Sequence, residues 1–285
     1  MSNVAGNPTV LRRQLGAELR RLRDAARKTV AASAEELGWS ESKLSRIETA
    51  HIGIRRSDLE SLLSLYGVSD IDRNRLIALA GQSRQRAWWE AYGDSLASAY
   101  ETFIGFEAEA TAISNFEAQV IPGLLQTTEY AHAVTQVDLA DNPQLVGQRV
   151  TVRMARQAVL TREPPPQILA IIDEGALRRP IGGRNVMRRQ LMRLAEVSEL
   201  PTITIQVLPF AAGAHRGLAG SFVILDFADA VEQPLVYCDG MTGGVIRTKS
   251  EDLDTYRMSL ESIKAASLNP SASIQLISAI ARGEG

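Results

Sequence analysis

The chain has 285 residues, of which 45% are hydrophobic and 22% charged, and this composition excludes collagens, mucins and wholly disordered proteins. The length suggests about two domains. No stretch reaches the ~18–20 apolar residues of a membrane span, and residues 1–8 lack the apolar core of a secretion signal. We therefore expect a cytoplasmic protein without membrane contact.

Cysteine and histidine usage argues against disulfides and zinc. The single Cys238 cannot form an internal disulfide, which agrees with a reducing compartment. The three His and one Cys are too far apart for ordinary zinc-ligand spacing. We expect no metal and no other cofactor.

Charge is distributed unevenly along the chain. Residues 1–86 contain 15 Lys and Arg against 10 Asp and Glu, a net charge of +5, so the remainder carries −7 of the total of −2. A basic segment joined to an acidic one predicts that only the first segment meets a polyanion.

The first 80 residues predict a compact all-α domain. In residues 9–26, apolar side chains recur at steps of three or four, the pattern of a one-faced helix. Gly38 ends a second helix, and Ser40 caps a third. The five expected short helices span residues 9–26, 31–37, 41–50, 58–66 and 70–80. We assign residues 1–82 to this domain.

The pattern changes after a polar linker at residues 81–86, and residues 83–285 predict a mixed α+β domain. Short runs rich in branched residues read as strands. These predicted strands are residues 168–172, 203–207, 222–227 and 235–237. Helical stretches lie between and after them, at residues 124–136, 143–161, 186–200, 250–265 and 274–281.

The strongest motif runs from Ala34 to Glu48 and reads AEELGWSESKLSRIE. It predicts a helix, a tight turn at Gly38, a serine cap and a second helix with small polar and basic residues outside. Such a unit can present its second helix to the major groove of DNA. The run resembles the repressor-like (Xre/Cro) helix-turn-helix family, whose signature matches "SRIE". The resemblance covers residues 9–80.

The resemblance assigns roles to individual residues. It implies DNA contacts from the start and outer face of the second helix, at Ser40, Glu41, Ser42, Lys43, Ser45 and Arg46. It also implies a structural ion pair between Glu48 and a first-helix arginine, Arg23 by register. Two arginines in the following loop, Arg55 and Arg56, can bind phosphate. The sequence departs from the family pattern at two positions. Val30 stands where the family usually has Gln, at the start of the helix over residues 31–37. Ala50 stands where it usually has Gly, after the helix over residues 41–50.

The remainder resembles an actinobacterial domain of unknown function, DUF5753, over residues 85–282. The similarity rests on runs such as Trp88-Trp89, residues 121–127 with Tyr130, residues 173–180 and residues 206–210. The resemblance implies a regulator of development or secondary metabolism, found beside small partner proteins of the DUF397 type. It supplies no catalytic residues, and we expect the chain not to be an enzyme.

A ligand or partner pocket is expected in this second domain. Residues 122–127 form a turn that feeds a helix start, and the glycine-rich loop at residues 210–220 carries a histidine and an arginine. Either feature can receive an anion, but an ordinary packed helix start and an ordinary flexible hairpin loop are the favoured explanations. The candidate pocket residues are Trp88, Trp89, Gln126, Tyr130, His215 and Arg216.

These patterns predict a DNA-binding transcriptional regulator, associated with the nucleoid and acting as a homodimer on double-stranded DNA. The second domain would dimerise and sense a small molecule or a partner protein. An alternative is an antitoxin-like protein that sequesters a small partner and autoregulates. A third is an enzyme with a DNA-binding tag, which would require turnover dependent on His215 or Cys238.

Overall fold

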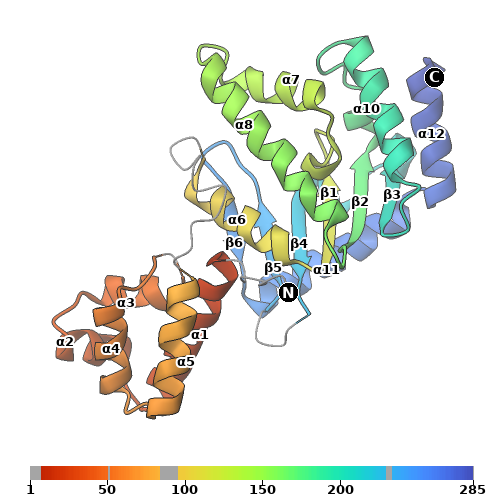
Figure 1. The fold of residues 1–285 in the computed structure, drawn as a ribbon. Helices are drawn as coiled ribbons and strands as arrows, with labels where there is room; N and C mark the ends of the chain where they lie inside the picture. The colour runs from red at the N-terminus through yellow and green to blue at the C-terminus, as the bar shows by residue number, and fades with distance from the viewer. Residues whose placement is uncertain (1–7, 51, 84–95, 229–232, 285) are drawn as a thin grey trace. The chain divides into compact units, whose positions relative to one another are not determined.

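The computed structural model describes residues 8–50, 52–83, 96–228 and 233–284. These residues form two compact units, one built from residues 8–83 and the other from residues 96–284. Each unit is described separately below (Figure 1). Among the described residues, no helix is both long enough and apolar enough to cross a membrane.

The first unit consists of five helices, as the sequence predicts. They are α1 (Pro8–Ala25), α2 (Val30–Glu36), α3 (Glu41–Glu48), α4 (Arg56–Leu65) and α5 (Asp70–Gln82). Side-chain oxygens cap three of them, because Thr29, Ser40 and Ser69 accept hydrogen bonds from the first turns of α2, α3 and α5. The helices surround a core of leucines that includes Leu19, Leu44, Leu59, Leu62 and Leu76.

Helices α1 and α3 approach each other closely at Gly16. A Cβ atom at this position would lie 2.6 Å from the carbonyl oxygen of Glu48 and 2.9 Å from that of Ile47. Only glycine fits this contact without a backbone shift. Gly16 therefore helps to set the position of α3 on the body of the unit.

The second unit is built on a six-stranded mixed sheet with strand order β3-β2-β1-β4-β5-β6. Strands β1, β2 and β3 run parallel, and β4, β5 and β6 continue the sheet by antiparallel pairing. The strands are β1 (Ala112–Glu117), β2 (Gln167–Asp173), β3 (Ile203–Leu208), β4 (Phe222–Asp226), β5 (Leu235–Cys238) and β6 (Val245–Arg247).

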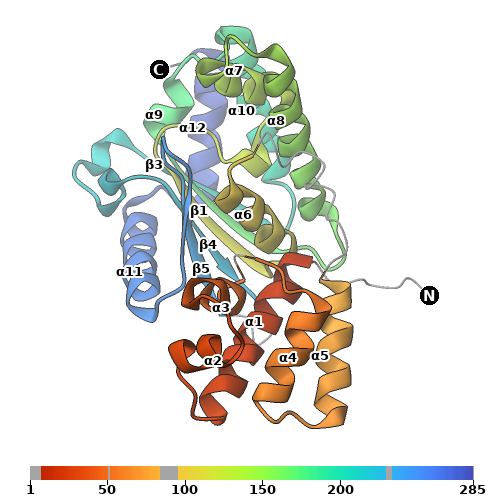
Figure 2. The ribbon, with the colours of Figure 1, turned by 90° about the vertical axis from the view of Figure 1, so that its left-hand side faces the viewer.

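Helices cover both faces of this sheet (Figure 2). The α-helices are α6 (Ser98–Glu109), α7 (Thr128–Asp138), α8 (Pro143–Arg156), α9 (Glu174–Arg178), α10 (Arg184–Val197), α11 (Ser250–Ala266) and α12 (Pro270–Arg282). Helix α11 packs on one face, where Leu260 and Ile263 join the apolar side chains of Phe116, Ile224 and Val236. Helices α6 and α8 lie on the other face, and α12 packs against β3 and α10.

The observed fold confirms the expected class, an all-α unit followed by an α+β unit. Four of the six strands coincide with predicted strands. The sequence pattern missed β1 and β6, and it also missed helix α6. The expected helix over residues 124–136 is instead a 3-10 turn, Gly123–Leu125, followed by α7.

Candidate functional site

Helices α2 and α3 are joined by a tight turn whose residues match their backbone conformations. Gly38 has a positive φ of 66°, which glycine adopts without the penalty that a side chain imposes. Ser40 follows in an extended conformation, and its hydroxyl oxygen accepts a hydrogen bond of 3.2 Å from the backbone N–H of Lys43. The turn therefore ends α2 and starts α3 within four residues.

The outer face of α3 is exposed along its whole length. Leu44 and Ile47 point into the core of the unit, with 0% and 3% of their surfaces exposed. The opposite face carries side chains that lie in solvent, namely Glu41, Ser42, Ser45 and Arg46. Within the described residues, the Arg46 guanidinium has no hydrogen-bond or ion-pair partner. Ser42 and Ser45 have short side chains and Arg46 carries a positive charge. This face can therefore approach a polyanion closely.

Lys43 differs from its neighbours because its ammonium has partners inside the unit. The Nζ atom lies 3.0 Å from Asp58 Oδ2 and 3.7 Å from the centre of the Trp39 ring. Lys43 thus links the start of α3 to α4 and to the turn. A contact from Lys43 to DNA would require it to share or leave the Asp58 carboxylate.

The Arg23–Glu48 pair that the resemblance implies is present and buried. Arg23 Nε donates to Glu48 Oε1 at 2.7 Å, and a second guanidinium nitrogen donates to Glu48 Oε2 at 3.1 Å. Their side chains are only 9% and 5% exposed. The same guanidinium also donates to the carbonyl oxygen of Lys28. The pair ties α3 to the end of α1 and to the start of α2, so it has a positioning role.

The loop after α3 carries the other predicted phosphate contacts. Arg55 and Arg56 are both exposed at the start of α4, and Arg56 donates to Glu60 at 2.9 Å. Ala50, at the position of the usual glycine, has a positive φ of 59°. The corner therefore keeps the left-handed conformation although its residue is not glycine. Val30, at the position of the usual Gln, packs against the core with part of its surface.

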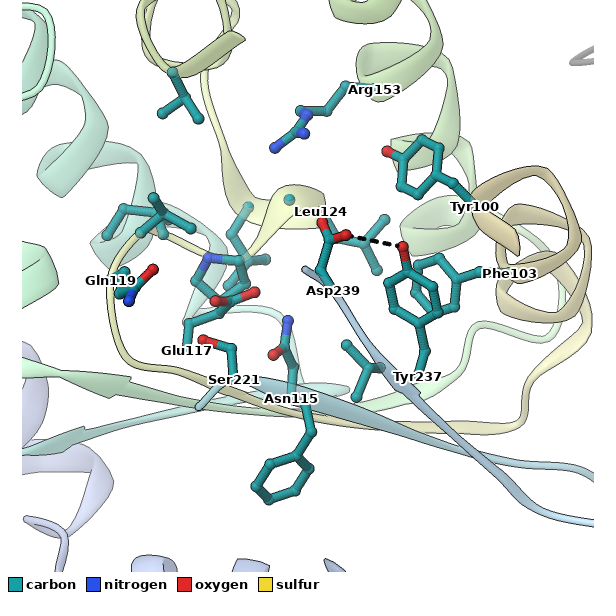
Figure 3. Close-up of a pocket in the computed structure, with 18 of the residues that line it drawn as sticks. Tyr100, Phe103, Asn115, Glu117, Gln119, Leu124, Arg153, Ser221, Tyr237 and Asp239 are labelled. Atoms are coloured by element: carbon teal, nitrogen blue, oxygen red, sulfur yellow. Dashed lines mark hydrogen bonds between the residues drawn. The ribbon is translucent and has the colours of Figure 1, made fainter. Parts of the chain in front are cut away.

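The second unit contains a cavity of about 620 Å³ on the face of the sheet that α6, α7 and α8 cover. This volume lies in the range of small-molecule sites, roughly 300–1,000 Å³. Figure 3 shows its floor, where Asn115 and Glu117 from β1 lie beside Ser221. Tyr237 and Asp239 at the end of β5 complete this floor.

Glu117 sits inside the protein with polar neighbours on its own sheet. Ser221 and Asn115 lie beside its carboxyl group and act to lower its pKa, and the Ser221 oxygen accepts from the Ala118 N–H at 3.0 Å. Burial nevertheless raises the pKa of Glu117 to about 7, and the charge of Asp239 adds to this rise. Arg153 acts in the opposite direction but does not offset the burial. The carboxyl group therefore titrates near neutral pH.

Other walls of the cavity are aromatic or ion-paired. The rings of Phe103 and Tyr237 stack with their centres 4.2 Å apart, and Tyr100 follows at 6.3 Å from Phe103. Arg156 forms a two-bond pair with Glu107, both bonds being 2.7 Å, and also contacts the Tyr100 hydroxyl. Because Glu107 and Arg156 neutralise each other, this wall adds no net charge.

Two of the predicted pocket residues lie behind the cavity wall. Gln126 is buried, donating to the carbonyl oxygen of Ile121 at 2.7 Å and accepting from Arg153 at 3.0 Å. Tyr130 is also buried, and its hydroxyl oxygen accepts from the Ile121 N–H at 3.1 Å. Burial raises the pKa of Tyr130 to about 12. Neither residue lines the cavity, and both hold the segment around Ile121 in place.

His215 and Arg216 are not brought to this cavity either. His215 Nε2 lies 3.8 Å from Asp173 Oδ2, and its ring packs against Phe116. Arg216 is exposed. Neither residue lines the cavity. Trp88 and Trp89 lie outside the described residues.

Sequence reasoning missed the residues that do form the cavity floor. Asn115 and Glu117 lie on β1, a strand that the pattern did not predict. A signal was available, because Ile113, Asn115 and Glu117 alternate with residues that face the other side of the sheet. No sequence pattern pointed to Asp239, which directly follows Cys238, whose thiol lies 3.2 Å from the Tyr256 hydroxyl.

Comparison with known families agrees with both resemblances. Residues 100–279 match the family described as Domain of unknown function (DUF5753), and residues 14–76 match the family described as Helix-turn-helix domain. Searches of curated proteins and of solved structures each gave no match. The helix-turn-helix match indicates that the first unit binds DNA and that the chain regulates transcription.

Proposed function

We propose that this chain, which belongs to the DUF5753 family, is a sequence-specific transcriptional regulator whose second unit receives a signal. In this proposal α3 enters the major groove of an operator. The second unit binds a small molecule or a partner protein, and it acts by binding rather than by catalysis. Such a protein would work in the cytoplasm on nucleoid DNA.

The observation that carries the DNA-reading proposal is the outer face of α3. Its serines are short enough to let the helix backbone approach the bases, and the unpartnered Arg46 guanidinium can reach a guanine edge. The buried Arg23–Glu48 pair and the close contact at Gly16 hold this helix in one position. Fixing α3 in this way favours recognition, because side chains that contact bases must be held within about 0.5 Å of the productive geometry.

We also propose that the chain binds DNA as a homodimer. One recognition helix contacts only a short half-site, and helix-turn-helix proteins commonly reach operator affinity through two half-sites about one helical turn apart. A two-fold dimer then requires a palindromic operator. Sedimentation of the full chain with and without a palindromic duplex tests this step, and a monomer bound to each half-site independently would contradict it.

The cavity in the second unit supports the sensing proposal. A ligand bound there can change DNA affinity only if it binds two arrangements of the protein with different affinities. The cavity is formed from residues between 100 and 241, far from α3 in the sequence. Sensing therefore requires coupling between a ligand site and a DNA site that are separate in the chain.

The test of DNA reading compares three variants of the full chain on duplexes from its own and neighbouring promoters. Arg46→Ala and Lys43→Ala should each weaken specific binding by about 1–3 kcal/mol. Arg75→Ala is the matched control, because it removes one positive charge from α5, where Arg75 pairs with Glu18. We expect Arg75→Ala to change the affinity by less than about twofold at physiological salt.

Fluorescence anisotropy with labelled duplexes at several salt concentrations measures these affinities. Equal losses for Arg46→Ala and Arg75→Ala would mean that only overall charge matters, and the assigned face would be wrong. Unchanged binding in both α3 variants would reject it as well.

A further inference from the structure

The charged groups that line the cavity favour some classes of ligand over others. Its floor presents two carboxyl groups, Glu117 and Asp239, that point into the same space (Figure 3). Glu107 also lines the cavity, but Arg156 satisfies it through two hydrogen bonds. The acidic groups that remain for a ligand at the floor are therefore those of Glu117 and Asp239.

We propose that the cavity binds a small molecule with a protonated amine attached to an apolar body, the ammonium group lying between Glu117 and Asp239. This inference rests on the proposed sensing function and names the chemical class of the ligand. An ammonium group carries three donors and one positive charge. Both match a floor made of carboxyl oxygens.

The groups that adjoin the two carboxyls are neutral, so none of them supplies a positive charge. Asp239 is contacted by the Tyr237 hydroxyl at 3.3 Å and by the Gly240 N–H at 3.0 Å, both neutral donors. The polar groups beside Glu117 are those of Ser221 and Asn115, which are also neutral. The nearby guanidinium of Arg153 donates to Gln126 and lies across the cavity from the floor. Arg149 and Asp138 line the cavity as well. A cation from the ligand would give both floor carboxylates a counter-charge at hydrogen-bonding distance.

The titration of Glu117 agrees with this geometry. Burial raises its pKa to about 7, so the carboxyl group is about half protonated at neutral pH. An ammonium group would replace that proton, because a nearby positive charge favours the ionised carboxylate. Binding an amine at pH 7 should therefore release about half a proton per molecule of amine bound.

The rest of the cavity suits the body of such a molecule. The lining also includes apolar side chains, Ile113 and Val223 on the sheet and Phe103, Ile121 and Leu124 from segments outside the sheet. Arg153 can donate to a hydroxyl or carbonyl oxygen at the far end of the ligand. A carboxylate placed on the floor would instead meet two acidic groups, which disfavours anionic ligands there.

The experiment uses two sets of matched probes with the full chain in the absence of DNA. One set is tyramine, tyrosol and 4-hydroxyphenylacetate, and the other is tryptamine, tryptophol and indole-3-acetate. Within each set the aromatic body is constant, and the end group is an ammonium, a neutral hydroxyl or a carboxylate. Isothermal titration calorimetry at pH 8 should give at least one amine that binds about tenfold more tightly than its alcohol and its acid.

Two further measurements assign the binding to Glu117. Glu117→Gln should weaken the amine about tenfold and leave the alcohol within about twofold, because only the charge is removed. The matched control is Glu129→Gln, which removes an exposed carboxylate on α7 outside the cavity and should change nothing. Wild-type affinity for the amine should fall about tenfold from pH 8 to pH 6, since Glu117 must lose its proton first.

The proposal is wrong if neither amine is preferred over its alcohol, if the acids bind best, or if Glu117→Gln binds the amine like the wild type. Its failure is separable from failure of the sensing function. An amine that binds as expected but leaves operator affinity unchanged would support the ligand class and contradict sensing. Arg46→Ala should keep amine binding while losing operator affinity.

Discussion

The ammonium of Lys43 lies 3.0 Å from the Asp58 carboxylate, so an ion pair joins helix α3 to α4. The side chains are 35% and 24% exposed, which places the pair at the edge of the exposed face of α3 rather than in the core. A partly exposed pair of this kind contributes only about 0–1 kcal/mol to stability. A DNA-bound Lys43 would share its ammonium group between the Asp58 carboxylate and the DNA.

Replacing Asp58 should therefore strengthen DNA binding. In Asp58→Asn, Lys43 no longer shares its charge with the Asp58 carboxylate, and the affinity for duplex DNA should rise severalfold. The slope of log affinity against log salt should steepen by up to about one, the value for one fully available phosphate contact. Anisotropy titrations at several salt concentrations measure both quantities. Asp70→Asn, which removes an exposed carboxylate at the start of α5, is the control, and an equal gain in both variants would contradict the role of Lys43.

A second prediction concerns the contact between α1 and α3 at Gly16. Gly16→Ala places a methyl group 2.6 Å from the Glu48 carbonyl oxygen, so it should destabilise the first unit by about 1–3 kcal/mol. Gly81→Ala is the control, because its Cβ would meet no atom within 4 Å, and a helical Gly→Ala change stabilises by up to ~1 kcal/mol. Hydrogen exchange of α1 and α3 in the full chain reports the difference. Equal protection in both variants would show that the helices can separate without cost.

The left-handed residue after α3 gives a third prediction. Ala50 has a φ of 59°, a conformation that costs a residue with a Cβ about 1–2 kcal/mol. Ala50→Gly should relieve much of this cost and stabilise the first unit by about 0.5–1 kcal/mol, less the added entropy of the unfolded glycine chain. Gly38→Ala makes the reverse change at a φ of 66° in the same unit and should destabilise it. Hydrogen exchange of α3 and α4 distinguishes the two, and loss of protection in Ala50→Gly would contradict the assignment.

The local signals of the first unit explain why its helices could be predicted. Leu15, Leu19 and Leu22 lie one turn apart on α1, and Gly38 and Ser40 mark the ends of α2 and α3. These features depend on neighbours in the sequence alone. The Arg23–Glu48 contact followed from a family pattern, because no local rule joins residues 25 positions apart.

Several features of the second unit could not be predicted from the sequence. Asn115 and Glu117 face the cavity, so the central strand β1 lacks the unbroken apolar run of a buried parallel strand. Helix α6 is buried on several sides, with Phe103, Ile104 and Phe106 all inside, so it shows no one-sided period. The cavity itself combines segments from residue 100 to residue 241, a juxtaposition that only the fold creates.

The pKa of Glu117 predicts a specific pH dependence of stability. The folded-state pKa is about 7, above the ordinary 4.5, so between these values the folded protein holds a proton that the unfolded chain releases. Stability therefore falls as pH rises from 4.5 to 7, by about 3 kcal/mol from this group, and the penalty persists above pH 7. The side chain at this position in the Glu117→Gln variant is neutral at every pH, so the variant does not lose this stability.

The variant should accordingly be close to the wild type in stability at pH 4.5 and more stable at pH 8. Urea denaturation of both proteins at the two pH values measures the difference, and other titrating groups cancel in the comparison. Glu129→Gln serves as the control and should show no such pH-dependent gain. A wild-type-to-variant difference that does not change with pH would mean that Glu117 titrates normally.

The central claim is that the exposed face of α3 reads base sequence. Selection of bound duplexes from a random library, followed by sequencing, tests this claim for the wild type and for Arg46→Ala. We predict that the wild type enriches one motif and that the variant loses preference at defined base pairs of each half-site, the ones that Arg46 contacts. Enrichment of the same motif with the same preferences by both proteins, or of no motif by the wild type, would contradict the account.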